Sequence, residues 1–139
     1  MLSITKNINM PFVRISLRKE LSDDTKTLIS KAIHQSLMQE FFIPKDDYFH
    51  VVEELDASQM KHPKEYLGVT HTDNLVYIQI TAGSGRTDEQ KRKLYADIAK
   101  RISTETEILI NDIIIILVEN GTFLNWSFGM GEIQKPSHI

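Results

Sequence analysis

The chain repeats its own pattern at a spacing of 65 residues, and this repeat restricts the fold more than any other feature of the sequence. The shift places one strand-like segment, residues 12–17, over another, residues 77–82. It also aligns a cap-like triplet and two acidic positions: Ser22-Asp23-Asp24 with Thr87-Asp88-Glu89, Asp47 with Asp112, and Glu54 with Glu119. A chain of 139 residues has room for one domain with a real core. We therefore expect two similar halves inside a single domain.

Each half has the pattern of a strand, a helix and a second strand. Residues 12–17 alternate with the period of two that a half-buried strand shows. Ser22, followed by two acids, is typical of a helix N-cap. Apolar residues then recur at helical spacing: Leu28, Ile29, Ala32, Ile33, Leu37 and Phe41. Pro44 ends the helical region, and residues 48–55 follow as a strand. The second half repeats this order with a strand at 77–82, a helix after Thr87 and a strand at 113–118.

Two right-handed β-α-β units place two helices on one face of a four-stranded sheet, which predicts an α+β fold. Residues 57–74 predict a connecting loop with room for a short extra strand, and residues 120–131 a small hairpin or loop. Residues 113–118 are apolar at every position, as in a strand covered on both faces. We expect a second copy of the chain to cover the face opposite the helices. The alternative is that the connecting loop and the C-terminal tail cover it.

Composition and charge exclude several classes of site and partner. The chain contains no cysteine, which removes disulfides, thiolate nucleophiles and zinc-thiolate sites. A net charge of -3 gives no long-range attraction to nucleic acid or to an anionic membrane. The longest apolar run, residues 113–118, is far shorter than the roughly 20 residues of a membrane helix. The five histidines lack the spacing of metal ligands. We expect a cytoplasmic protein with no metal, no nucleic-acid partner and no membrane contact.

Ten residues into the chain, Met10-Pro11 precedes the first strand in the manner of a translation start. Four further motifs follow in order: Ile43-Pro44-Lys45-Asp46-Asp47, Gly85-Arg86-Thr87-Asp88-Glu89-Gln90-Lys91, Val118-Glu119-Asn120 and Asn125-Trp126-Ser127-Phe128-Gly129. Their order and spacing resemble the tautomerase superfamily, most closely its malonate semialdehyde decarboxylase-like group, over about residues 11–131. The resemblance implies a tautomerase-like fold, a homotrimer and catalysis without a cofactor.

In that family the initiator methionine is removed and the nitrogen of the exposed proline does the chemistry. The resemblance implies that Met10 is the start, that residues 1–10 are an N-terminal extension and that residues 11–139 form the tautomerase-like domain. A free proline is a secondary amine that accepts a proton, whereas a proline inside a chain is an amide without a basic lone pair. A terminal α-amine titrates at about 7.7 to 8.0, which suits a general base near neutral pH. If the extension is retained, Pro11 is an ordinary residue at the start of a strand and the protein is catalytically silent.

Arg86 stands between the third strand and the Thr87 cap. A guanidinium there can pair bidentately with a carboxylate and stabilise a developing enolate, which is the role that the resemblance implies. The alternative is a solvated surface arginine. Asp47 matches an active-site aspartate of the decarboxylase group, and its alternative is a structural turn aspartate. Ser84 stands where that group has a second arginine, which weakens the case for decarboxylation and affects tautomerisation less.

Trp126 and Phe128 resemble the aromatic wall beside the family's site, which would accept an apolar part of the substrate, although aromatics there also suit a subunit interface. His50, three residues after Asp47, is a candidate for the border of the pocket, and a half-buried strand histidine is the alternative. The sequence predicts a cofactor-independent keto-enol tautomerase of small 2-keto acids in which Pro11 carries the proton. A malonate semialdehyde decarboxylase-like lyase or hydratase is the alternative.

Overall fold

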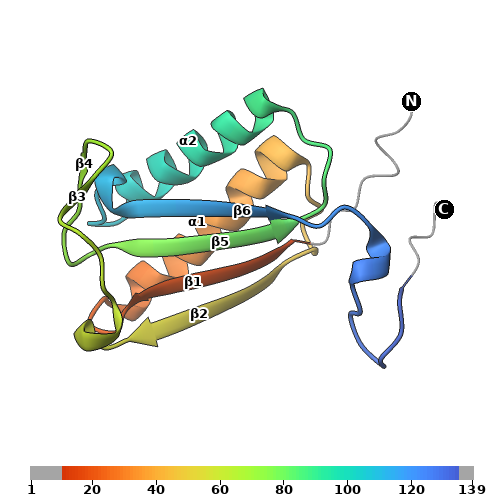
Figure 1. The fold of residues 1–139 in the computed structure, drawn as a ribbon, viewed down its shortest axis with the longest axis horizontal. Helices are drawn as coiled ribbons and strands as arrows, with labels where there is room; N and C mark the ends of the chain where they lie inside the picture. Colours follow the sequence, from red (N-terminus) through yellow and green to blue (C-terminus); the bar gives the residue numbers. More distant parts are fainter. Residues whose placement is uncertain (1–10, 135–139) are drawn as a thin grey trace.

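The computed structural model describes residues 11–134, which form a sheet of four long strands with two helices packed on one face (Figure 1). The elements of the two halves are β1 (Phe12–Arg18), α1 (Asp23–Phe41) and β2 (Phe49–Leu55), then β5 (Val76–Ala82), α2 (Asp88–Glu105) and β6 (Ile113–Glu119). The predicted α+β fold is confirmed. The predicted extension, residues 1–10, lies outside the described residues, as do residues 135–139.

The strands lie in the order β2-β1-β5-β6. Strands are parallel within each half, β1 with β2 and β5 with β6, and the two halves meet through the antiparallel pair β1 and β5. The starts of β1 and β2 therefore lie at the same end of the sheet as the finishes of β5 and β6 (Figure 1). We call this the proline end, because Pro11 directly precedes β1, and we call the other the distal end.

Both helices begin at the residues that the sequence indicated. The side chain of Ser22 accepts a hydrogen bond from the backbone N–H of Thr25, at 3.1 Å. Thr87 and Gln90 cap each other's backbone N–H groups at the start of α2. These contacts satisfy N–H groups that would otherwise lack partners in the first turn. The caps fix the start of each helix relative to the strand before it.

The core lies between the helices and the sheet. The alternate residues of each strand that face the helices pack with the buried stripes of α1 and α2. The repeat also preserves an ion pair between helix and strand. Lys26 of α1 lies 2.7 Å from Glu54 of β2, and Lys91 of α2 lies 3.2 Å from Glu119 of β6. Both partners are shifted by the same 65 residues, so the two halves share packing and electrostatics.

The outer face of the sheet, which points away from the helices, is not fully covered by residues 11–134. Ile116 and Val118 are 47% and 41% exposed, and Phe49 and Val51 are exposed as well. Within the described residues, the outer face of residues 113–118 is therefore only partly covered, and the expected cover by a second copy stays a prediction. The connecting loop reaches this face at the distal end, where the hydroxyl of Tyr77 donates to the carbonyl oxygen of Lys61 at 3.5 Å, and Phe128 packs against Phe49 at the proline end. Ile116 and Val118 stay exposed, so the described parts of the loop and tail cover only part of the face.

The connecting segment contains more order than a loop. Residues 57–59 form a short 3-10 turn, and β3 (Glu65–Tyr66) pairs with β4 (Val69–Thr70) in a small hairpin at the distal end. After β6, a 3-10 turn at Phe123–Asn125 leads into an irregular segment beyond the proline end (Figure 1). In the part of the chain that the structure describes, no helix is both long and apolar enough to span a bilayer.

Candidate active site

The topology gathers the predicted site residues at the proline end. Phe12, the first residue of β1, pairs with Phe49 on one side and with Thr81 on the other. The neighbour Pro11 is buried there, and Asp47 lies two residues before β2. Arg86 and Ser84 follow the finish of β5. Four segments that are distant in the sequence therefore meet at one end of one sheet.

Arg86 is buried at this end, with 8% of its surface exposed. Its Nη1 donates to the carbonyl oxygen of Gly83 at 2.9 Å, and its Nη2 donates to that of Phe41 at 3.3 Å. The guanidinium carbon lies 4.6 Å from the centre of the Phe41 ring. Two of the five N–H groups of a guanidinium are thus in use, which leaves up to three for a bound anion. Arg86 is not the solvated surface residue of the alternative interpretation.

The charge of Arg86 is only partly compensated. Burial lowers the pKa of its guanidinium, and the carboxylate of Glu119 opposes this shift. Glu119 is itself paired with Lys91 at 3.2 Å. A cation that has lost water attracts an anion more strongly than a solvated one does. The position is therefore suited to a small carboxylate ligand.

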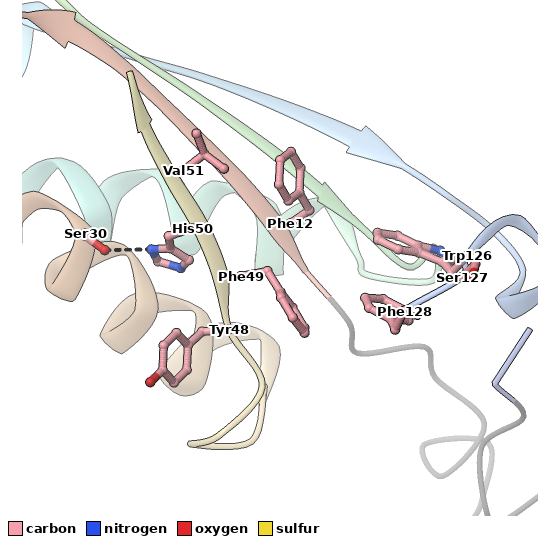
Figure 2. Close-up of a pocket in the computed structure, with 9 residues that line it drawn as sticks. All are labelled: Phe12, Ser30, Tyr48, Phe49, His50, Val51, Trp126, Ser127 and Phe128. Atoms are coloured by element: carbon pink, nitrogen blue, oxygen red, sulfur yellow. Dashed lines mark hydrogen bonds between the residues drawn. The ribbon is translucent and has the colours of Figure 1, made fainter. Parts of the chain in front are cut away.

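A pocket of 840 Å³ lies at the proline end, around the starts of β1 and β2 (Figure 2). Its lining is mainly aromatic and apolar, and consists of Phe12, Ser30, Tyr48, Phe49, His50, Val51, Trp126, Ser127 and Phe128. Pro11, Asp47, Ser84 and Arg86 are not among the described lining residues. Two of them are chain neighbours of the lining, because Phe12 follows Pro11 and Tyr48 follows Asp47.

The predicted aromatic wall is present in this pocket. The rings of Trp126 and Phe128 are stacked at 5.3 Å with an interplanar angle of 6°, and Phe128 also contacts Phe49 at 5.4 Å. The irregular segment after β6 is thereby packed against the start of β2 (Figure 2). The sequence analysis missed Phe12 and Phe49, although both lie on the outward-facing period of their strands.

His50 also lines the pocket, as proposed, and is a half-buried strand histidine at the same time. Its Nδ1 lies 2.8 Å from the hydroxyl of Ser30 on α1, a contact that the sequence did not reveal. Burial, with a smaller contribution from His34, lowers the pKa of His50 from 6.5 to about 4. The imidazole is therefore neutral at physiological pH, and it adds a polar but uncharged group to an apolar wall.

The two remaining candidates differ in exposure. Asp47 is half-buried in the turn before β2, and its backbone N–H donates to the carbonyl oxygen of Pro44 at 3.0 Å. Ser84 is exposed, and a Cβ built on Gly121 would lie only 3.2 Å from its hydroxyl oxygen. Within residues 11–134, no group of three or more histidine, aspartate or glutamate side chains is arranged to hold a metal ion.

The sequence as a whole is similar to those of known tautomerases. Two family models, each described as a tautomerase enzyme, match residues 47–129 and 11–67. The probable tautomerase YusQ of Bacillus subtilis (strain 168) is 42% identical over 125 residues, which cover 90% of this chain and 98% of that protein.

Solved structures show the same fold. The FG41 malonate semialdehyde decarboxylase inhibited by 3-bromopropiolate superposes with a TM-score of 0.81 at 28% identity, over 88% of this chain and 92% of the other. A symmetric trimer of wild-type fused 4-OT superposes with a TM-score of 0.66 at 17% identity, over 79% of this chain and 85% of the other. The second likeness concerns the fold alone.

Proposed function

The chain belongs to the tautomerase family, and from this premise we propose that it interconverts the keto and enol forms of small 2-keto acids with the ring nitrogen of Pro11 as the proton carrier. The observation that carries the proposal is the meeting of a proline, a buried arginine and an aspartate at one end of the sheet, next to an aromatic pocket.

The reaction needs one base, one anion holder and one proton path. In the direction of ketonisation, the Pro11 amine takes the proton of the enol hydroxyl and the resulting ammonium returns a proton to C3, so that no atom is gained or lost. Arg86 holds the carboxylate and offsets the negative charge that develops on the enolate oxygen. Asp47 favours the protonated amine through its charge. The aromatic pocket excludes water and receives the apolar part of the substrate.

The base exists only if Pro11 is the first residue. An acylated proline has no basic lone pair and no N–H, so residues 1–10 must be absent from the active form. The start of one family match at residue 11 supports this division of the chain into an extension, 1–10, and a tautomerase-like domain, 11–139.

We also propose that the active form is a homotrimer. The partly covered outer face of the sheet, with Ile116 and Val118 exposed, needs a partner. A second copy is the simplest one, and the trimeric 4-OT protein with this fold supports the number three.

The proposal is tested with two forms of the protein. One begins at Pro11, produced from a Met10 start and verified by intact mass, and the other retains residues 1–10. Only the first is expected to ketonise the enol of phenylpyruvate, followed by ultraviolet absorbance. In the first form, Pro11→Ala should lower kcat/KM by about 10² to 10⁴, the usual contribution of a general acid–base group. Undiminished activity of the alanine variant, or equal activity of the extended form, would rule out this mechanism.

A second candidate activity is decarboxylation or hydration of a 3-oxo acid, favoured by the likeness to malonate semialdehyde decarboxylase. Ser84 counts against it, because a hydroxyl replaces one of the two cations that anchor the carboxylate. We expect weak turnover of malonate semialdehyde by the form that begins at Pro11, and an increase in Ser84→Arg. A loss of activity in Ser84→Arg would exclude this candidate.

A further inference from the structure

We infer that Phe41, the last residue of α1, is a positioning residue for Arg86: its ring and carbonyl hold the guanidinium in the orientation that receives a substrate carboxylate. The inference rests on the proposed function of Arg86 and extends it to a residue outside the pocket. Phe41 belongs to the buried core cluster and is not among the described lining residues of the pocket.

Three contacts from two elements fix the guanidinium. The carbonyl oxygens of Gly83 and Phe41 accept from Nη1 and Nη2 at 2.9 and 3.3 Å, which sets the direction of the group. The face of the Phe41 ring, 4.6 Å from the guanidinium carbon, limits its movement on one side. Helix α1 has no basic residue in its last turn, so Arg86 also supplies the cation that the negative end of the helix dipole favours.

The repeat shows that the fold itself does not require this arrangement. A shift of 65 residues relates Arg86 to Leu21, which is buried in the hydrophobic core, and relates Phe41 to Thr106. At the distal end the position of the arginine is therefore filled by leucine, and that of the ring by threonine. The contact between ring and guanidinium is specific to the proline end, where the carboxylate of the substrate is expected.

The carboxylate of Glu119 does not replace the ring. Glu119 favours the charged form of Arg86, but its carboxylate forms its hydrogen bond with Lys91 at 3.2 Å. Without the ring, the guanidinium can turn about its long side chain, and its free N–H groups lose a fixed direction. A bidentate carboxylate depends on that direction, because it needs two parallel N–H donors.

The test compares Phe41→Leu with wild type, both beginning at Pro11, on the enols of phenylpyruvate and of its methyl ester. We expect the KM for the acid to rise about tenfold, as for a lost cation–π contact in a desolvated site. The KM for the ester should change little, because the ester has no carboxylate for the guanidinium to hold. Phe41→Tyr keeps an aromatic face and should restore the KM for the acid. An unchanged KM, or an equal change for acid and ester, overturns the inference.

A matched control separates positioning from packing. Leu37 is fully buried one turn earlier on α1 and makes none of the contacts with Arg86 described above. Leu37→Ala should lower the melting temperature at least as much as Phe41→Leu does, yet leave the preference for acid over ester unchanged. If Leu37→Ala shifts that preference equally, Phe41 acts only through packing and the inference is wrong.

A binding measurement distinguishes failure of this inference from failure of the proposed function. Phenylacetate carries the carboxylate but cannot tautomerise, and its binding can be followed by calorimetry. If phenylacetate binds about tenfold more weakly to Phe41→Leu while wild type turns over no enol, the proposed reaction fails and the positioning role stands. If wild type turns over the acid and Phe41→Leu matches it, only the positioning role fails. If wild type neither binds nor turns over acids, both fail.

Discussion

The two ends of the sheet are built from equivalent positions of the repeat, yet only the proline end carries the proposed site. At the distal end, Val76 and Leu21 are buried in the core, where the proline end has Pro11 and Arg86. A fold that accepts leucine at one of two equivalent positions does not need arginine at the other. Differences between equivalent positions therefore point to chemistry, and identities point to architecture.

The two aspartates of the repeat are an exception, because the same residue has different surroundings at the two ends. Asp112 is fully buried, and its carboxylate accepts hydrogen bonds from the backbone N–H and the hydroxyl of Thr72, at 2.7 and 2.5 Å. It fastens the loop before β5 to the start of β6. Asp47 is half-buried beside the pocket. One position thus serves architecture at the distal end, while we propose a catalytic role for it at the proline end.

The largest expected effect comes from making the proline end resemble the distal end. Arg86→Leu should lower kcat/KM for a 2-keto acid by 10² or more in the form that begins at Pro11, because the carboxylate loses its cation. The melting temperature should stay within about 5 °C of wild type, since replacing a buried charge by an apolar residue is often neutral. Enzyme assays and thermal unfolding measure both. A variant with low stability and full activity would reverse the interpretation of the two ends.

The reciprocal change, Leu21→Arg, places an unpaired cation in the core of the distal end. We expect a loss of about 3 kcal/mol or more in the free energy of unfolding, with no gain in activity. Urea unfolding of the two reciprocal variants shows whether the proline end accommodates a guanidinium that the distal end rejects. Equal losses in both would mean that neither end is specialised for it.

Replacing the two aspartates should have opposite effects: one variant should lose stability and the other activity. Asp112→Asn should lower the free energy of unfolding by about 2 kcal/mol, because the two donors of Thr72 use both carboxylate oxygens and an amide replaces one oxygen by an NH2 donor. Its kcat/KM should stay near that of wild type. Asp47→Asn should do the reverse, with at least a tenfold loss in kcat and a stability change within about 1 kcal/mol. Urea unfolding and steady-state kinetics on the same preparations test this expectation, and two variants that behave alike would contradict it.

His50 should make the stability of the fold depend on pH. The second half of the repeat has no such contribution at this position, because the residue equivalent to His50 is Ile115. Burial lowers the pKa of His50 to about 4, so between pH 6.5 and 4 the unfolded chain binds a proton that the folded chain does not. Stability from this group is complete above pH 6.5 and is lost as the pH falls toward 4. After allowance for partial exposure, we expect a loss of about 1 to 2 kcal/mol.

Urea unfolding at pH 7 and at pH 4.5 measures this dependence. His50→Ile copies the residue of the second half and should flatten the acidic side of the profile. If the variant and wild type lose equal stability between the two values, other groups cause the loss and His50 is not responsible.

The smallest effects are expected from the ion pairs that the halves share. Lys26 has a side chain only 10% exposed and donates to Glu54 and to the carbonyl oxygen of Lys19, whereas the side chain of Lys91 is 26% exposed and is paired with Glu119. Lys26→Met should therefore lower stability by about 1 kcal/mol and Lys91→Met by less. Added salt should reduce the second effect more than the first. A loss of more than about 3 kcal/mol in the free energy of unfolding of either variant would contradict the modest contribution expected of these ion pairs.

Much of the fold was predictable because the repeat, the caps and the strand periods are local signals. Ser22 and Thr87 indicated the starts of both helices, and alternation placed the strands within one residue of their observed bounds. The hairpin around Gly68 was foreseen only as a short extra strand, since its pairing depends on turn geometry. The cover of the outer face could not be predicted in the same way. Residues 113–118 are apolar at every position, which indicates cover on both faces, but the described residues of one chain bury only the face toward the helices.

The site was predictable as a set of residues but not as an arrangement. The position of Arg86 against Phe41 depends on how the end of α1 meets the loop after β5, and no local pattern encodes that contact. The bond between Ser30 and His50 joins a helix to a strand in the same way. By contrast, Phe12 and Phe49 could have been identified, because outward aromatic residues at the starts of neighbouring parallel strands meet at one end of the sheet.

Trp126, stacked on Phe128 in the wall of the pocket, is the single tryptophan of the chain. Its emission therefore reports on one place in the molecule, and a ligand that separates or shields the two rings changes the colour or intensity of that signal. Intrinsic tryptophan fluorescence can therefore rank unlabelled compounds by their binding in the pocket before any substrate is known.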